Sequence, residues 1–215
     1  MDEHFQWSAL AAAAIGALLG SRVLAVLEQM PGRDLSIDRV FLPGSGQTIV
    51  GGLLGGWAAV ELWKLCSGIR ARTGDVFALP LCIGIAVGRI GCFLAGLADD
   101  TYGKPAQLPW AVDFGDGVPR HPTQLYEVAF LLVLACFLWR ARRRLYPPGT
   151  CFRIFLTGYL GWRLFIDFLK PQPLIDGMNC IQWSCLLGLL VLGWSAYRDG
   201  LQGTSRGAMQ GKKHA

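Results

Sequence analysis

The sequence indicates an all-α, polytopic integral membrane protein with about six transmembrane helices and a long external loop. Of its 215 residues, 53% are hydrophobic and only 16% are charged, and the mean hydropathy is +0.39. Apolar stretches of roughly 20 residues, the length that crosses a bilayer as a helix, recur along the chain. Six such spans leave no room for a separate water-soluble domain.

The candidate spans follow one another in a single domain over residues 1–198. They cover about residues 7–27, 46–66, 76–96, 123–139, 151–169 and 181–197. The first follows the leader MDEHFQ, which has two acidic residues and no Lys or Arg, and it is too long for the apolar core of a signal peptide. We therefore expect no cleaved leader, and a basic cytoplasmic tail over residues 199–215.

Positive charge collects at every second connection between spans, which predicts the orientation of the chain. The clusters contain Arg70 and Arg72; Arg140, Arg142, Arg143 and Arg144; and Arg198, Arg206, Lys212 and Lys213. Because Lys and Arg are enriched in cytoplasmic loops, both termini are expected in the cytoplasm and residues 97–122 outside it. The basic tail does not indicate a nucleic-acid partner, since it adjoins a span and suits anionic membrane lipids.

The seven cysteines predict neither a disulfide framework nor a metal site. They lie mostly within spans or at their edges, and none forms a CxxC or Cys/His ligand pattern. Cysteine is a common small apolar residue in packed interiors, so we expect packing roles, with no metal and no other cofactor.

Two segments stand out by composition. Gly51, Gly52, Gly55 and Gly56 form overlapping pairs of small residues, which allow another helix backbone to approach closely. Helix packing is the favoured interpretation, and direct contact with a substrate is the alternative. The external segment 97–122 is rich in Gly, Pro, Asp and Trp, which predicts turns rather than a helix.

Three arginines lie inside predicted spans, where a charge is costly and normally pairs with an anion. Counted at about 1.5 Å per residue from the cytoplasmic side, Arg22, Arg89 and Arg163 all reach the outer half of the bilayer. Guanidinium groups donate paired hydrogen bonds that suit phosphate. The alternative is structural: Arg163 pairs with Asp167 on its own helix, and Arg89 binds backbone carbonyls.

Two further residues have side chains suited to proton transfer. Tyr159 precedes Arg163 by four residues, so both lie on one helical face, where the phenol is a hydrogen-bond donor or a general base. His121 stands between Arg120 and Pro122, just before a helix start that attracts anions. For His121, a substrate contact and a purely structural role both stay open.

Several motifs, taken in chain order, resemble the signature of the bacterial prolipoprotein diacylglyceryl transferase family. The most specific is RHPTQLYE at residues 120–127. The others are GRIGCFLAG at 88–96, YGKP at 102–105, Pro109-Trp110, the segment 158–168 with its Tyr and Arg, and Gly51-Gly52-Leu53. Together these motifs extend over most of the chain.

The resemblance implies an enzyme of lipoprotein biosynthesis in the bacterial inner membrane. It implies transfer of a diacylglyceryl group from phosphatidylglycerol to the lipobox cysteine in the signal peptide of an exported prolipoprotein, with release of glycerol phosphate. On this basis the catalytic residues are Arg89, Arg163, Tyr159 and His121. The substrate-binding residues in these motifs are Arg120, Gln124, Tyr126, Glu127, Gly103, Gly51 and Gly52, and Arg22 is added because of its depth in the first span.

The chain also departs from the family pattern. Val50 stands where the family usually has a histidine, Cys92 replaces an asparagine, and residues 97–101 replace a shorter turn. The family usually has one more N-terminal helix, and this chain is expected to begin after it. The alternatives are a non-catalytic paralogue that binds anionic lipid or lipoprotein, and a transferase with another acceptor. A transporter is disfavoured because the sequence has no internal repeat.

Overall fold

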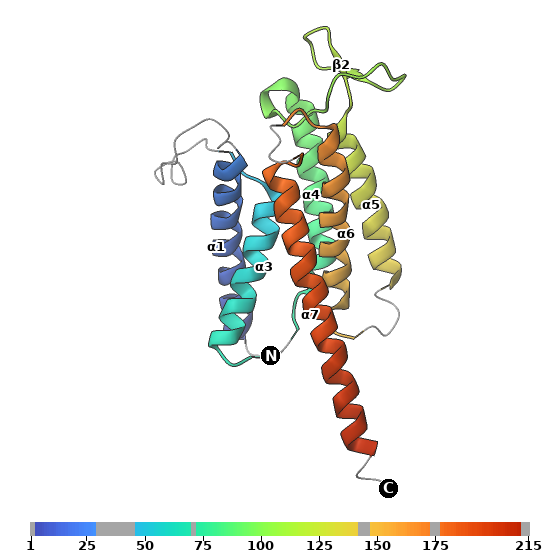
Figure 1. The fold of residues 1–215 in the computed structure, drawn as a ribbon. Helices are drawn as coiled ribbons and strands as arrows, with labels where there is room; N and C mark the ends of the chain where they lie inside the picture. The colour runs from blue at the N-terminus through green and yellow to red at the C-terminus, as the bar shows by residue number, and fades with distance from the viewer. Residues whose placement is uncertain (1–2, 29–45, 70–71, 142–146, 173–176, 212–215) are drawn as a thin grey trace.

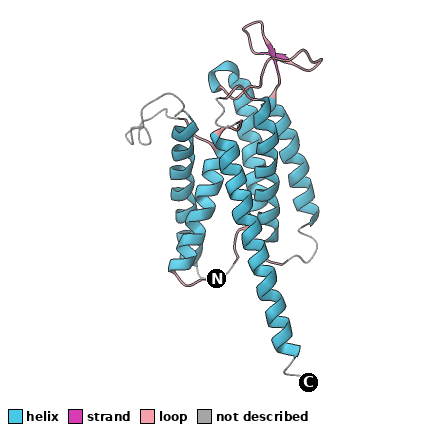
Figure 2. Cartoon of the chain, viewed as in Figure 1, coloured by secondary structure: helices cyan, strands magenta, loops and turns pink. Residues whose placement is uncertain are grey.

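The computed structural model describes residues 3–28, 46–69, 72–141, 147–172 and 177–211. Within them, six long helices run alternately up and down (Figure 1): α1 (Glu3–Glu28), α3 (Ile49–Cys66), α4 (Asp75–Ala95), α5 (Thr123–Ala141), α6 (Thr150–Ile166) and α7 (Cys180–Gly211). Two short 3-10 helices, η1 (Gly96–Asp99) and η2 (Asp167–Leu169), extend α4 and α6. The all-α prediction is confirmed: in the described part, strands are limited to β1 (Val112–Asp113) and β2 (Pro119–Arg120) (Figure 2).

The helices have the lengths and surfaces of membrane-spanning segments. Five of them, all except α6, are long and apolar enough to cross a membrane, and the 17-residue α6 is lengthened by η2. Large apolar side chains cover the outside of the bundle, and several are at least 60% exposed: Ile15, Leu62, Val87, Val133 and Leu187. Water-soluble proteins rarely expose so much apolar surface, so the prediction of a polytopic membrane protein is confirmed.

Helices α1 and α3 form a closely packed pair because glycines meet along their contact. A Cβ added at Gly51 would lie 2.3 Å from the carbonyl oxygen of Gly20, and one added at Gly55 would lie 2.3 Å from that of Gly16. At the start of α3, the side chain of Thr48 accepts a hydrogen bond from the Gly51 amide at 3.2 Å and caps the helix. The helix-packing interpretation of the glycines is confirmed.

Replacing Gly51 with leucine is expected to lower the free energy of unfolding by about 1–3 kcal/mol, because the backbone of Gly20 blocks the new side chain. Thermal unfolding of the detergent-solubilised protein measures this loss. Gly84→Leu is the matched control, since no atom of the described residues lies within 4 Å of a Cβ added at Gly84. Equal melting temperatures for the two variants would contradict the prediction.

Helices α4 to α7 pack around a shared apolar core, whose fully buried members include Leu131, Phe155, Leu156, Tyr159, Leu160 and Cys185. Asp75 of α4 joins the start of α6 to this bundle. Its carboxylate accepts hydrogen bonds from the backbone amides of Gly149 at 2.6 Å and Phe152 at 2.9 Å. Cys82 is also buried in this core, and Cys151 packs against it, as expected for small apolar residues.

The segment between α4 and α5 folds into a small lobe at one end of the bundle (Figure 1). Strands β1 and β2 pair in antiparallel fashion, with Val112 opposite Arg120. The Asp113 carboxylate closes the turn between them by accepting hydrogen bonds from the amides of three following residues, 115 to 117. The prediction of turns in this segment is confirmed.

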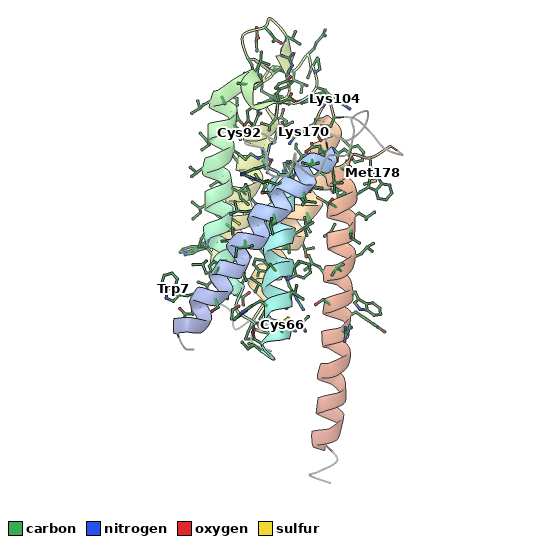
Figure 3. All side chains as sticks on the ribbon, turned by 90° about the vertical axis from the view of Figure 1, so that its left-hand side faces the viewer. Trp7, Cys66, Cys92, Lys104, Lys170 and Met178 are labelled. Carbon is green, nitrogen blue, oxygen red and sulfur yellow. The ribbon has the colours of Figure 1, made fainter. Side chains whose placement is uncertain are left out.

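Both ends of the described chain lie at the end of the bundle opposite this lobe, as an even number of crossings requires (Figure 1). Trp7 and Cys66 lie toward that end, whereas Cys92, Lys104 and Lys170 lie toward the lobe (Figure 3). Several arginines that predict the cytoplasmic side lie outside the described residues, namely Arg70, Arg142, Arg143 and Arg144. The orientation of the bundle across the membrane therefore stays a prediction.

Candidate active site

The carboxylate of Glu127, near the start of α5, is the centre of an ion-pair network between three helices. Its Oε2 lies 2.9 Å from Nε of Arg89 on α4 and 3.2 Å from Nη1 of Arg163 on α6. All three residues are buried, with exposed fractions of 1% for Glu127, 6% for Arg89 and 3% for Arg163. Two of the three intramembrane arginines therefore meet on a carboxylate.

Tyr159, one turn before Arg163 on α6, binds the other oxygen of the same carboxylate. Its hydroxyl donates a hydrogen bond to Oε1 of Glu127 at 2.6 Å, and the residue is fully buried. A phenol that donates to an ionised carboxylate keeps its proton. Of the two roles that the sequence allows for Tyr159, this geometry favours the donor over the general base.

A second carboxylate, Asp167, extends the network toward the external lobe. Its Oδ1 lies 2.8 Å from Nη2 of Arg163 and 3.5 Å from Nζ of Lys170, which is 5% exposed. Arg163 therefore makes the pair with Asp167 that the structural alternative predicts, and it also pairs with Glu127. Sequence reasoning did not select Lys170, although it follows Arg163 by seven residues and Asp167 by three, a spacing that shares a helical face.

Several buried polar atoms, some of them in this network, have no hydrogen-bond partner in the described part of the chain. They are Nε of Arg89, Nε of Arg163, Nε1 of Trp162, Oε1 of Gln124 and Oδ1 of Asp167, the last of which has the two ion-pair contacts described above but no aligned hydrogen bond. Although Nε of Arg89 is close to Glu127, its N–H does not point at the carboxylate. Buried groups without partners are rare, and a ligand is one of the few explanations for them. Guanidinium groups with unused donors suit a phosphate.

An aromatic cluster with one histidine lies where the external lobe joins α5. The hydroxyl of Tyr126 accepts a hydrogen bond from Nε1 of Trp110 at 2.8 Å and lies 3.3 Å from Nδ1 of His121. The rings of His121 and Tyr126 meet edge to face, with centroids 6.1 Å apart. The structure thus brings these two predicted site residues together, and their roles toward a substrate stay predictions.

Two residues predicted to bind substrate have structural contacts within the lobe. Both Nη atoms of Arg120 donate to the Asp116 carboxylate at 2.7 Å, and the guanidinium lies over the ring of Tyr102. The hydrogen bonds from Arg120 lower the pKa of Asp116. At Gly103, an added Cβ would lie 2.6 Å from Cβ of His121. Arg120 and Gly103 thus contribute to the folding of the lobe, and no substrate contact is required to explain their presence.

Comparison with known proteins identifies the family of this chain. The family model for prolipoprotein diacylglyceryl transferase matches residues 2–197. The chain belongs to this family. Relatives named phosphatidylglycerol–prolipoprotein diacylglyceryl transferase include one from Bordetella avium, 36% identical over 193 residues that cover 83% of this chain and 72% of the relative. Those from Cupriavidus pinatubonensis and Azoarcus sp. are 32% and 33% identical, covering 89% and 90% of this chain and 74% and 77% of the relatives.

In this member of the prolipoprotein diacylglyceryl transferase family, the remaining predicted residues lie on α1 and α3. Gly51 packs against Gly20, and a Cβ added at Gly52 would lie 3.7 Å from the carbonyl oxygen of Ala17. Both glycines therefore contact α1, and no substrate is needed to explain them. Arg22 is half-buried on α1, and its role in binding an anion stays a prediction.

The position of Val50 shows how this family member fills the place of the expected histidine. Val50 is 1% exposed and belongs to the same apolar cluster as Tyr159 and Leu160. An imidazole at this position would be buried among apolar side chains, where its charged form is disfavoured. In the described structure, position 50 thus contributes packing and no titratable group.

Proposed function

We propose that this protein transfers the diacylglyceryl group of phosphatidylglycerol to the cysteine sulfur of a prolipoprotein. The thiolate attacks the glycerol carbon that bears the phosphate ester, so that a C–S bond forms as the C–O bond breaks. The electron pair of the broken bond leaves with glycerol phosphate, and the thiol proton passes to solvent. The names of the relatives supply the two substrates, and the buried arginines suit the leaving group.

The convergence of Arg89 and Arg163 inside a membrane bundle is the observation that carries this proposal. Guanidinium groups from two helices approach the same oxygen of Glu127 within 3.2 Å, so an anion bound beside them meets two fixed cations. Negative charge grows on the phosphate as the C–O bond breaks, and fixed cations in a water-poor site stabilise it. Glu127 acts as a positioning residue for both arginines, and Tyr159 holds Glu127 by its hydrogen bond.

A direct transfer assay tests the proposal. Purified protein mixed with labelled phosphatidylglycerol and a lipobox peptide is expected to form the thioether product and glycerol phosphate in equal amounts. Arg163→Ala, which removes a guanidinium paired with both Glu127 and Asp167, is expected to bind the peptide but form no product. Phosphatidylglycerol binding without product by the wild type supports the non-catalytic paralogue instead. Product formed only with another thiol supports a different acceptor.

The proposal also includes the placement of the protein in a bacterial inner membrane. Residues 1–198 form the transmembrane domain, both termini are cytoplasmic, and residues 199–215 form a basic tail that contacts anionic membrane lipids. The site then lies toward the outer leaflet, on the side of the external lobe. Support comes from the positive charge of Arg72, which precedes α4, of Arg140 in the last turn of α5, and of Arg198 on the far part of α7, beyond the predicted span.

This orientation predicts the outcome of cysteine labelling in intact cells. On a cysteine-free background, Gln107→Cys is expected to react with a membrane-impermeant reagent from outside, whereas Ser67→Cys reacts only after the membrane is opened. Both positions are exposed, and they lie at opposite ends of the bundle, so each is the control for the other. The reverse labelling pattern contradicts the cytoplasmic termini.

The activity is expected to depend on the protonation of Lys170. Burial, and then the positive charge of Arg163, lower the pKa of Lys170 from 10.5 to about 8. The cation beside Asp167 is therefore lost as the pH rises through about 8, whereas Lys170→Arg keeps it. The ratio of Lys170→Arg to wild-type turnover is expected to rise up to ~tenfold between about pH 7 and pH 9.

The acceptor thiol ionises in the same way in both assays, so its effect on turnover cancels in this ratio. The shift also affects stability: between about pH 8 and 10.5 the unfolded chain binds the proton that the folded protein has released. The wild type is therefore expected to gain stability as the pH rises through this range. A turnover ratio that does not change with pH excludes a role for the charge of Lys170.

A further inference from the structure

We propose that Gln124 selects phosphatidylglycerol by accepting a hydrogen bond from a hydroxyl group of its glycerol headgroup. This inference rests on the proposed function and adds a residue that determines which lipid is used. It starts from a buried amide whose carbonyl oxygen has no partner in the described part of the chain.

The amide of Gln124 is held in one orientation by Thr101. Gln124 Nε2 lies 3.3 Å from Thr101 Oγ1. The Thr101 hydroxyl has a single proton and donates it to Oδ2 of Asp99 at 2.5 Å, so its oxygen can only accept from Gln124. Thr101 is fixed in turn by the Thr123 hydroxyl, which donates to its carbonyl oxygen at 2.8 Å. The NH2 group of Gln124 therefore faces Thr101, and Oε1 is on the other side of the amide.

Among the described residues, none donates to the carbonyl oxygen of Gln124, although Gln124 is only 1% exposed. Gln182, at the start of α7, shows that this bundle satisfies a buried glutamine when only structure is required. Its Nε2 donates to the carbonyl oxygen of Leu164, and its Oε1 accepts from the amide of Asn179, both at 2.9 Å. A buried acceptor without a donor is costly, and a ligand hydroxyl that donates to it recovers this cost.

Gln124 lies one helical turn from the proposed phosphate site. It precedes Glu127 by three residues on α5, so the two side chains share a face of the helix. The headgroup glycerol is bonded directly to the phosphate that Arg89 and Arg163 hold. Its hydroxyl-bearing carbons reach about one helical turn, ~5 Å, from the phosphorus, which matches the step from Glu127 to Gln124.

A lipid hydroxyl supplies the donor that this acceptor lacks. A headgroup with an ammonium group brings a positive charge next to Arg89 and Arg163, which is unfavourable, and phosphatidic acid has no headgroup alcohol to reach beyond the phosphate. The other source of a proton donor is the S–H group of the acceptor cysteine. A contact with that thiol is the same for every lipid donor, so the choice of lipid distinguishes the two sources.

The test compares phosphatidylglycerol with phosphatidylpropanol, whose headgroup has three carbons and no hydroxyl. The wild type is expected to show a kcat/KM at least about tenfold higher for phosphatidylglycerol, because the analogue leaves Gln124 Oε1 unpaired. Gln124→Met keeps the length of the side chain but has no amide oxygen. It is expected to use the two lipids within about twofold of each other, because only the reaction with phosphatidylglycerol slows.

Gln182→Met is the matched control, since it makes the same change at a buried glutamine whose amide is already satisfied. Gln182→Met is expected to lower kcat/KM for both lipids by the same factor, so that the wild-type preference for phosphatidylglycerol is kept. If Gln124→Met lowers kcat/KM equally for both lipids, or abolishes the reaction with both, then Gln124 has a structural role or contacts the thiol. The proposal is then wrong. A wild type that uses both lipids equally also overturns it. A wild type that forms no thioether from either lipid overturns the proposed function, and this inference with it.

Discussion

Replacing Glu127 with alanine is expected to abolish diacylglyceryl transfer and to destabilise the bundle by roughly 3–5 kcal/mol. The carboxylate is 1% exposed and is a common partner of Arg89, Arg163 and Tyr159. Without it, the buried Arg89 loses its ion-pair partner, Arg163 keeps only its pair with Asp167, and the phenol of Tyr159 loses its acceptor. Denaturant unfolding of the detergent-solubilised protein, followed by its helical circular dichroism, measures the loss of stability.

Glu61→Ala is the control for the loss of an acidic side chain. Glu61 also pairs with a cation, Lys64 at 2.7 Å, but its own side chain is 49% exposed and it has no second cation among the described residues, so its removal is expected to cost less than that of Glu127. Glu127→Gln keeps an acceptor for Tyr159 while removing the charge. Its loss of stability is expected to lie between those of Glu127→Ala and Glu61→Ala. If Glu127→Ala unfolds at the same denaturant concentration as Glu61→Ala, the ion-pair network does not hold the helices together.

The sequence predicts the spans and the buried arginines well because both follow from the cost of polar groups in lipid. A run of about 20 apolar residues identifies a span. A charged residue inside it indicates a site even when the group that pairs with the charge is unknown. The periodicity of one helix also places Tyr159, Arg163 and Asp167 on one face, and the structure joins the last two directly. These inferences need no knowledge of which helices are neighbours.

The sequence does not reveal that Glu127 joins both arginines, because that depends on how α4, α5 and α6 meet. Glu127 follows Arg89 by 38 positions and precedes Arg163 by 36, and no periodicity of a single helix connects them. The family motif selects Glu127 as a substrate-binding residue, whereas its contacts are with other side chains of the site. Its effect on the reaction then passes through the arginines that it positions.

The same limit explains Arg120 and Gly103. Both belong to specific motifs, but a motif does not separate residues that bind a ligand from residues that fold the loop around it. Arg120 pairs with Asp116 across the hairpin turn, and Gly103 leaves room for His121. The turn composition predicts that the segment is ordered by local contacts, and it does not predict which charges those contacts use.

Arg89→Lys is expected to lower kcat/KM at least about tenfold, or ~1.4 kcal/mol of transition-state stabilisation, while the bundle still folds. Lysine keeps the positive charge beside Glu127, so the ion pair that holds α4 to α5 is retained in a weaker form. It loses the planar fork that donates two parallel hydrogen bonds to a phosphate. Because these bonds strengthen as charge grows on the leaving group, kcat is expected to fall more than KM changes.

Arg153→Lys controls for the same substitution in a membrane helix away from the site. Arg153 lies near the start of α6, where its Nη2 donates to the Ser195 hydroxyl at 2.9 Å, and its replacement is expected to leave transfer unchanged. Single-turnover rates with labelled phosphatidylglycerol then separate the chemical step from lipid binding. Wild-type rates in Arg89→Lys mean that a point charge is sufficient at this position. In that case the phosphate is held elsewhere, and Arg89 serves mainly as the buried counter-ion of Glu127.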